Sequence, residues 1–200
     1  MDKSPRRYGC IIGDVKCHAS KTQRFKSFFE NETNFGPATL AVFHTMKSPM
    51  FIEFLENMTG IHGLKPDPDY VGSGIHQTLK GGYLDIHSDF NLHERLEHRH
   101  RRVNVFLYLN SDWPAEYGGA LELWHQDLKS CGAKLLPLTN RFVLFSSTDF
   151  TFHGQPHPLT CPPGRSRRSL ALYYYTKTRP PSECVNGECY VLRSTRYKET

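Results

Sequence analysis

Residues 81–90 read Gly81-Gly82-Tyr83-Leu84-Asp85-Ile86-His87-Ser88-Asp89-Phe90, a short strand pattern introduced by a glycine pair. Successive side chains of a β-strand point to opposite faces, so Tyr83, Asp85, His87 and Asp89 are predicted to share one face. The pair His87-x-Asp89 then presents an imidazole and a carboxylate to the same ligand. On an α-helix these two positions would diverge by about 200°. The strand context therefore makes the pair a candidate metal site.

His153 is the candidate third ligand. It follows residues 141–146, an apolar segment that predicts a buried strand, so its imidazole could reach the metal from a neighbouring strand. Two histidines and one aspartate in the order His-x-Asp…His form the ligand set of a 2-His-1-carboxylate facial triad. Such a triad holds Fe(II) on one face and leaves the opposite face open for a co-substrate and O₂.

The other histidines fit a metal site less well. His157 is the one plausible substitute for His153, but a proline flanks it on each side. His93 and His98 are five positions apart, which turns their imidazoles about 140° from each other on a helix. The zinc-protease pattern His-Glu-x-x-His needs four positions. His76 is interpreted as a hydrogen-bonding structural residue.

Strand patterns dominate the chain from about residue 70 onward. Glycine, proline or asparagine separates each short pattern from the next, as in a sandwich or barrel. The predicted strands are residues 83–90, 102–110, 120–125, 141–146 and 167–176. Helices segregated to the N-terminal part complete an α+β, mainly β fold with the helices packed on one side.

Two helices are predicted in the first third of the chain. One covers residues 20–31, where three phenylalanines recur at helical spacing. The other covers residues 49–59, with Ser48 as a good N-cap and Gly60 as a terminator. The face that this second helix is expected to bury consists of Phe51, Leu55 and Met58.

Length and composition indicate one globular domain. The chain has 200 residues, of which 38% are hydrophobic and 22% charged. No apolar run approaches the roughly 20 residues that span a bilayer, and the start carries no signal-peptide pattern, so we expect a cytoplasmic protein. The net charge is +5, and a basic run lies at residues 93–102. We interpret this run as a solvated loop, with steering of an anionic co-substrate as the alternative; no nucleic-acid-binding module accompanies it.

The six cysteines are scattered and lack the paired spacing of a structural zinc site. Cys184 and Cys189 bracket Asn186-Gly187, a strong two-residue hairpin signal. A disulfide across this hairpin is geometrically possible. In a reducing compartment, free thiols are the favoured state.

An Arg-x-Ser pattern follows the candidate metal histidine. Arg167 and Ser169 open a strand that looks buried, and they share a face that Arg168 opposes. A guanidinium with a hydroxyl two residues further on can hold a carboxylate bidentately and satisfy its remaining lone pairs. The pattern therefore predicts an anchor for an acidic ligand.

These residues resemble the Fe(II)/2-oxoglutarate-dependent dioxygenases, in particular their prolyl 4-hydroxylase-like branch. The resemblance implies a double-stranded β-helix, or jelly-roll, core over residues 70–178. Residues 1–69 would be a helical region packed on the core, and residues 179–200 a C-terminal extension with a short hairpin. The motifs that carry the resemblance are His87-x-Asp89, Tyr108-Leu109-Asn110, Gly118-Gly119-x-Leu121, His153 and Arg167-x-Ser169.

The resemblance also implies roles for the site residues. His87, Asp89 and His153 would bind Fe(II), which 2-oxoglutarate chelates. The distal carboxylate of 2-oxoglutarate would lie on Arg167, with Arg168 as the alternative. The residues that assist this anchor would be Tyr108 and Ser169. The implied cofactors are Fe(II), 2-oxoglutarate as co-substrate, O₂, and ascorbate as reductant.

The activity so implied is hydroxylation of an unactivated C–H bond with release of succinate and CO₂. The favoured substrate is a prolyl residue of a peptide or protein. A free amino acid or small metabolite is the alternative substrate, and a non-catalytic cupin-like metal-binding module is the alternative class. Demethylation of nucleic acid has only the basic run in its favour. We expect no membrane partner.

Overall fold

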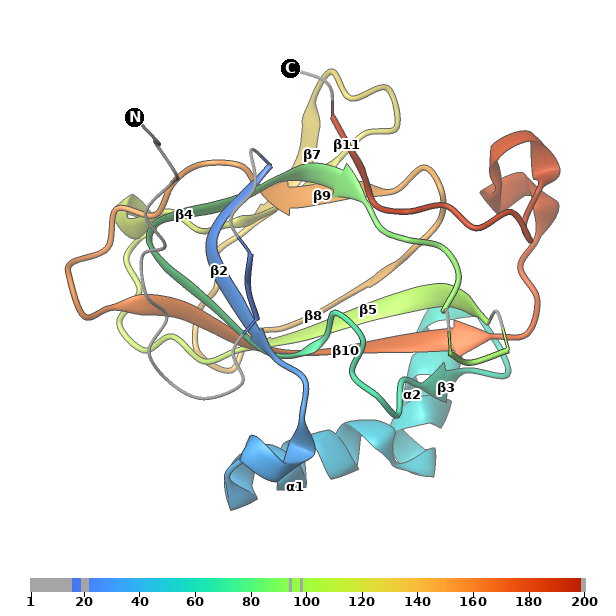
Figure 1. Cartoon of the computed structure of the whole chain (residues 1–200), viewed down its shortest axis with the longest axis horizontal. Helices are drawn as coiled ribbons and strands as arrows, with labels where there is room; N and C mark the ends of the chain where they lie inside the picture. Colours follow the sequence, from blue (N-terminus) through green and yellow to red (C-terminus); the bar gives the residue numbers. More distant parts are fainter. Residues whose placement is uncertain (1–15, 19–21, 94, 98, 199–200) are drawn as a thin grey trace, which may run out of the picture.

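The computed structural model describes residues 16–18, 22–93, 95–97 and 99–198. Its strands form one curled antiparallel sheet with the central order β7-β6-β9-β4-β10-β5-β8 (Figure 1). The strands are β1 (Lys16–His18), β2 (Gln23–Phe29), β3 (Lys65–Pro66), β4 (Gly74–Ser88), β5 (His100–Tyr108), β6 (Leu121–Trp124), β7 (Cys131–Leu135), β8 (Phe142–Ser146), β9 (Phe152–Gln155), β10 (Ser166–Thr176) and β11 (Arg196–Tyr197). The helices are α1 (Pro37–Lys47) and α2 (Pro49–Thr59), with 3₁₀ turns at Glu32–Asn34, Ala115–Tyr117, Pro181–Glu183 and Val185–Gly187.

The sheet curls until β4 and β9 lie above β5, β8 and β10 (Figure 1). β10 joins the two halves because it pairs with β4 through residues 166–171 and with β5 through residues 169–176. Inward-facing side chains fill the space between the halves with an aromatic core, made of Phe106, Tyr108, Leu121, Val143, Ala171, Tyr173 and Tyr175. This arrangement confirms the predicted mainly β jelly-roll core.

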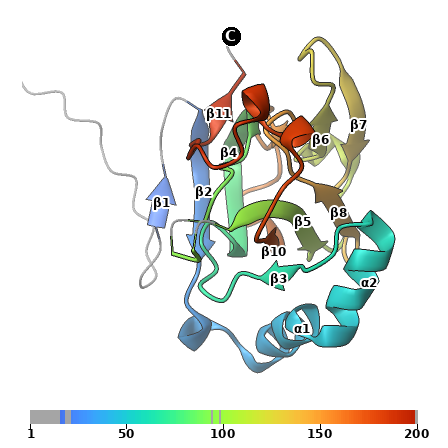
Figure 2. The same ribbon diagram turned by 90° about the vertical axis from the view of Figure 1, so that its right-hand side faces the viewer.

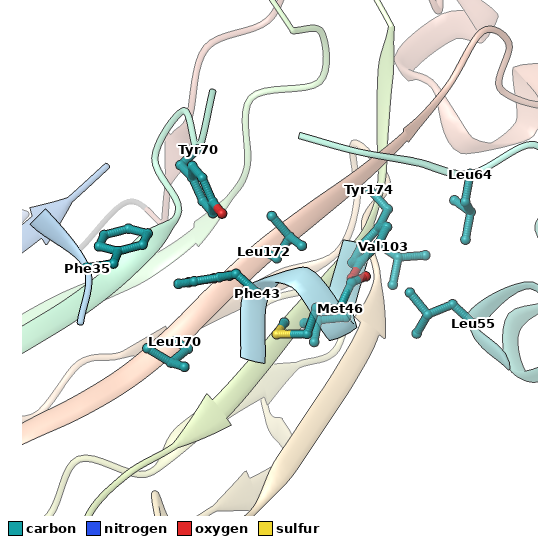
Figure 3. Packing of buried hydrophobic residues seen from close by; sticks show 11 residues of the cluster. Phe35, Phe43, Met46, Leu55, Leu64, Tyr70, Val103, Leu170, Leu172 and Tyr174 are labelled. Carbon is teal, nitrogen blue, oxygen red and sulfur yellow. The ribbon is translucent and has the colours of Figure 1, made fainter. Parts of the chain in front are cut away.

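Helices α1 and α2 pack side by side against the outside of the β5–β10 half, as Figure 2 shows. A second core lies between helices and sheet (Figure 3), in which Phe43 and Leu55 from the helices contact Leu172 and Tyr174 of β10. The predicted boundaries of α2 are confirmed. The Ser48 side chain accepts a hydrogen bond from the first turn, and Gly60 ends the helix with φ of 69°.

The predicted buried face of α2 is only partly confirmed. Leu55 is 0% exposed, whereas Met58 is 62% exposed, because the helix lies on the sheet through its middle turns. Replacing Leu55 by alanine should lower the free energy of unfolding by about 2–5 kcal/mol, from lost burial and the cavity left behind. The matched change Met58→Ala should cost less than about 0.5 kcal/mol. Urea denaturation measures both, and equal losses would contradict this packing.

The helix predicted at residues 20–31 is wrong: residues 23–29 form strand β2. β2 pairs antiparallel with β4, with Lys26 opposite Thr78. A bulge at Phe25, whose φ is 49°, shifts the register within this pairing. The helical spacing of the phenylalanines is overridden because β4 offers β2 a ladder of backbone hydrogen bonds, a tertiary effect that local propensity does not contain.

The predicted hairpin around Asn186-Gly187 is also wrong. Residues 185–187 form a 3₁₀ turn in which Asn186 is left-handed, with φ of 55°. Cys184 and Cys189 are joined as a disulfide across a Cα–Cα distance of 5.2 Å, where free thiols were expected. Free thiols were expected because a reducing compartment favours them. The tight turn places the two buried sulfurs close enough to bond.

None of the helices in the described part of the chain is both long and apolar enough to cross a bilayer.

Candidate active site

Strands β4 and β9 bring the three candidate metal ligands together. His87 and His153 are direct partners in the antiparallel pairing, and their ring centroids are 4.4 Å apart. Asp89 lies just beyond the end of β4, with its two carboxylate oxygens each 3.7 Å from the Nε2 atom of one histidine. One donor atom from each of the three residues lies within 4.8 Å of the other two.

A β-bulge in β4 aims these ligands. Leu84 of β4 pairs with Gln155 of β9, and His87 pairs with His153. The two residues of β4 are three positions apart and those of β9 only two, so β4 has one extra residue. As a result Leu84 lines the cavity with His87, which corrects the prediction that Tyr83 and Asp85 share the ligand face. The alternation of side chains between the two faces of β4 is interrupted at the extra residue of the bulge.

The bulge also orients the His87 ring. The Nδ1–H group of His87 donates a hydrogen bond to the backbone carbonyl of Asp85, at 2.8 Å. This leaves Nε2 of His87 directed at Asp89. Gly154 of β9 permits this close approach. A Cβ at position 154 would lie only 2.7 Å from the Asp85 carbonyl oxygen.

Both imidazoles are held neutral, the form that binds a metal. Burial lowers the pKa of His153 to about 3, and burial likewise lowers the pKa of His87 below its ordinary value. In the metal-free protein these groups take up protons only on unfolding, where the pKa of histidine is about 6.5. The unfolded state then binds more protons between these pKa values, so stability falls as the pH drops below about 6.5.

We therefore expect the His153 imidazole to lower the unfolding free energy of the metal-free protein by up to about 1.4 kcal/mol per pH unit as the pH falls. The effect should be seen between about pH 6 and 5, above the ordinary pKa values of aspartate and glutamate. Denaturation of the wild type and of His153→Gln across this range measures it. The variant should show a smaller slope; equal slopes would mean that His153 is protonated in the fold.

Arg101 and Asn104 of β5 hold Asp89 in place. The Arg101 guanidinium lies 3.0 Å from Oδ2 of Asp89, to which the Asn104 amide also donates at 2.7 Å. Arg101 donates in turn to the Asn104 side-chain oxygen at 2.8 Å, and its guanidinium lies 3.4 Å from the ring centre of Tyr173. Burial alone would raise the pKa of Asp89, but Arg101, the two histidines and Asn104 lower it below its usual range.

The basic run at residues 93–102 is only partly the solvated loop that was expected, because Arg95 and Glu97 are exposed in a turn whereas both ends of the run are buried. Four of its side chains are buried: those of His93, His100, Arg101 and Arg102. In the pairing with β10, strand β5 has one extra residue, Arg102, between Val103 and Arg101. Arg101 points inward because of this bulge. The two-residue period of a strand predicts that Asn104 and Tyr108 share one face of β5. It does not predict the bulge that turns Arg101 to the same face.

The predicted carboxylate anchor lies at the other end of the same cavity. Arg167 is buried, donates from Nε to the Gly119 carbonyl at 2.8 Å, and donates from Nη2 to the Tyr108 hydroxyl at 3.1 Å. Gly119 is needed here, since a Cβ would lie 3.0 Å from Cδ of Arg167. Arg168 is exposed, so Arg167 is the arginine that faces the cavity. Ser169 is buried beside this anchor, and its hydroxyl has no hydrogen-bond partner among the described residues.

The alternative histidines lie outside the cluster. The His157 side chain is 77% exposed and its nearest carboxylate is that of Glu122, at 3.9 Å. His76 is buried, lines the cavity and shares a hydrogen bond with the Gly72 carbonyl, in keeping with the structural role expected for it.

The C-terminal strand adds a residue that the sequence did not point to. Strand β11 lies beside β4 (Figure 2). Tyr197 of β11 pairs with His87, and its ring lies 5.5 Å from the imidazole. The next residue, Lys198, places its ammonium 4.0 Å over the ring of Trp124. Both contacts lie close to the ligand cluster, so the C-terminal segment forms part of its surroundings.

The donor set fits an iron and a dicarboxylate. Two neutral imidazoles and one ionised carboxylate are the ligands of an open Fe(II) site. At the other end of the cavity, Arg167 donates to two neutral oxygens, and the nearby buried hydroxyl of Ser169 has no hydrogen-bond partner within the described ranges. A carboxylate there would complete both groups.

Comparison with known proteins defines the class. Residues 73–175, more than half of the chain, match the 2OG-Fe(II) oxygenase superfamily. The chain belongs to this family, which implies Fe(II), 2-oxoglutarate and O₂. The cupin-like binding module is therefore set aside.

Among individual proteins, the mouse (Mus musculus) prolyl 3-hydroxylase OGFOD1 is 32% identical over 88 residues, which are 41% of this chain and 16% of that protein. The chain thus matches a small part of this curated relative. A Pseudomonas putida prolyl-4-hydroxylase has the same fold, with a TM-score of 0.59, 17% identity and coverage of 82% of this chain and 79% of that one. A Trichoplax adhaerens prolyl hydroxylase, solved with a hypoxia inducible factor peptide fragment, gives a TM-score of 0.54, 17% identity and coverage of 82% and 71%.

Proposed function

We propose that this dioxygenase hydroxylates a prolyl residue of a peptide or protein, with His87, Asp89 and His153 as the iron ligands and Arg167, Tyr108 and Ser169 as the 2-oxoglutarate anchor. The observation that carries the proposal is a single cavity lined by both groups of residues. The candidate metal ligands lie at one end, and at the other lies buried Arg167, which pairs with no carboxylate among the described residues. A metal site and a separate carboxylate site in one cavity suit a co-substrate that chelates the metal with one end and carries a carboxylate at the other.

The protein's part in the reaction is positioning. Bound Fe(II) and 2-oxoglutarate supply the oxidative decarboxylation with O₂ that yields succinate, CO₂ and an oxidised C–H bond. The Asp85 carbonyl keeps the His87 proton on Nδ1, so that Nε2 is free for the metal. Arg101 and Asn104 keep the Asp89 carboxylate ionised and fixed. We propose ascorbate as the accessory reductant and the cytoplasm as the location.

A second cavity of about 510 Å³ suits the substrate. It opens beside His153 and is lined by aromatic side chains of β6, β8 and the β8–β9 connection, among them Trp124, Phe145 and Phe150. Aromatic walls pack well against a pyrrolidine ring, and the similarity to three prolyl hydroxylases favours proline. A free amino acid or small metabolite would fit the same volume and is the second candidate. Burial of Arg101 and Arg102 weakens the one feature that favoured nucleic acid, the basic run.

Anaerobic titration tests the co-substrate half of the proposal. Adding 2-oxoglutarate to the Fe(II)-loaded protein should produce the weak visible charge-transfer band of the chelate. Arg167→Met should weaken 2-oxoglutarate binding by about 10- to 100-fold, because it removes a buried charged hydrogen-bond donor. Arg168→Met, an exposed neighbour on the same strand, is the matched control. Folded wild-type protein that gives no band would refute the proposal.

Succinate release tests the substrate half. Proline-containing peptide pools should stimulate succinate formation above the uncoupled rate, and mass spectrometry of those peptides should show a gain of one oxygen atom on proline. Stimulation by free amino acids alone would instead favour the metabolite candidate. Omitting ascorbate should lower the number of turnovers before inactivation.

A further inference from the structure

Lys26 lines the same cavity as the anchor and the metal ligands. It lies on β2, the strand that the sequence predicted as a helix, and outside the residues that match the family. Neither the sequence pattern nor the comparisons therefore give it a role.

The sheet register places Lys26 in one row with the anchor. Thr78 of β4 is directly opposite Lys26 of β2 on one side and directly opposite Arg167 of β10 on the other. Directly opposed residues of antiparallel strands project to the same face, and neighbouring strands are about 4.8 Å apart. Lys26 and Arg167 thus flank Thr78, and all three line the cavity. Both long side chains can reach a group that lies over Thr78.

The charges of the cavity are not balanced within the protein. Arg101 is neutralised by Asp89 at 3.0 Å. Arg167 donates to a carbonyl and a hydroxyl, and the Lys26 ammonium lies 4.6 Å over the ring centre of Phe28. Across residues 22–93, 95–97 and 99–198, neither Lys26 nor Arg167 forms an ion pair with a carboxylate. Lys26 and Arg167 therefore face the cavity without a carboxylate paired to either of them among the described residues.

Such an arrangement is costly unless an anion binds. Burial, followed by the charge of Arg167, lowers the pKa of Lys26 to about 7, so the surroundings of Lys26 disfavour a second positive charge. A carboxylate bound between the two cations would reverse this effect, because each opposite charge stabilises the other in a low-dielectric cavity.

We propose that Lys26 is a second cationic contact for 2-oxoglutarate, holding the distal carboxylate together with Arg167. This inference rests on the proposed function. The distal end is assigned because Lys26 and Arg167 share one row of the sheet, whereas the metal ligands lie toward the end of β4, at positions 87 and 89. Lys26 is thus a positioning and selectivity residue for a dicarboxylate co-substrate.

The test measures binding and not turnover. The anaerobic Fe(II) protein is titrated with 2-oxoglutarate and with 2-oxobutyrate, a 2-oxo acid that lacks the distal carboxylate, and the charge-transfer band is followed. Lys26→Met should bind 2-oxoglutarate about 10- to 100-fold more weakly. Its affinity for 2-oxobutyrate should equal that of the wild type. Lys26→Arg should restore most of the 2-oxoglutarate affinity, and Lys80→Met, which removes an exposed lysine of β4, should change neither affinity.

The outcomes are distinguishable. If Lys26→Met binds 2-oxoglutarate as tightly as the wild type, or loses affinity for both acids equally, the inference is overturned. A wild type that gives no band with either acid refutes the proposed function itself. Lys26→Gln replaces the methionine variant if that variant does not fold, as judged by its thermal unfolding.

Discussion

Replacing Arg101 by leucine is expected to lower the unfolding free energy of the metal-free protein by about 3–5 kcal/mol. The reason is that the change leaves the carboxylate of Asp89 in the interior without its buried counter-ion, which lies 3.0 Å away in the wild type. Asn104 still donates to Asp89, but a neutral amide replaces little of the lost charge. Urea denaturation in the presence of a chelator measures the loss.

Two comparisons separate this effect from a packing defect. In an Asp89→Asn background, Arg101→Leu should cost clearly less, since no buried charge is then left unpaired. Adding a divalent metal should also stabilise Arg101→Leu more than the wild type, because the cation replaces the missing charge beside Asp89. If both backgrounds lose the same stability and metal rescues neither, Arg101 acts by packing on Tyr173 alone.

The second large effect concerns the metal ligands. His87→Ala should weaken metal binding by more than about 100-fold, since hydrogen-bonding partners of metal ligands already contribute about 10- to 100-fold. Succinate formation should fall with it. Equilibrium dialysis of the folded protein against Mn²⁺ or Fe(II), under anaerobic conditions, measures the affinity directly.

His157→Ala is the matched control for that experiment, because its imidazole is exposed and lies outside the ligand cluster. It should bind metal as tightly as the wild type. A loss of metal in His157→Ala with retention in His153→Ala would reverse the assignment of the third ligand.

The candidate site residues could be predicted because they depend on strand order and local alternation. His87 and Asp89 lie at the end of one strand, and Arg167 and Ser169 share one face of another, so short-range periodicity suffices to group them. The structure brings these residues, His153 and Tyr108 to one region of the sheet. Their functional roles stay predictions until the metal and 2-oxoglutarate titrations are done.

What the sequence could not predict depends on bulges and long-range pairing. One bulge turns Leu84 instead of Asp85 toward the ligands, and another turns Arg101 inward from a run that looks solvated. Each inserts one residue, and no local pattern marks its position. Lys26 was missed for a related reason: its strand exists only because β4 pairs with it, while its own phenylalanine spacing favours a helix.

Strand β4 receives a partner from each end of the polypeptide, β2 from the N-terminal side and β11 from the C-terminal side. β10, which carries Arg167, also pairs with β4. During synthesis, β2 emerges before His87, whereas β9, β10 and β11 emerge after it, and contacts of such high sequence separation form slowly. The candidate ligand set is complete only after His153 of β9 has emerged. We therefore expect metal loading to be a late event in the biogenesis of this protein, and nascent chains that end before His153 should be poor iron binders.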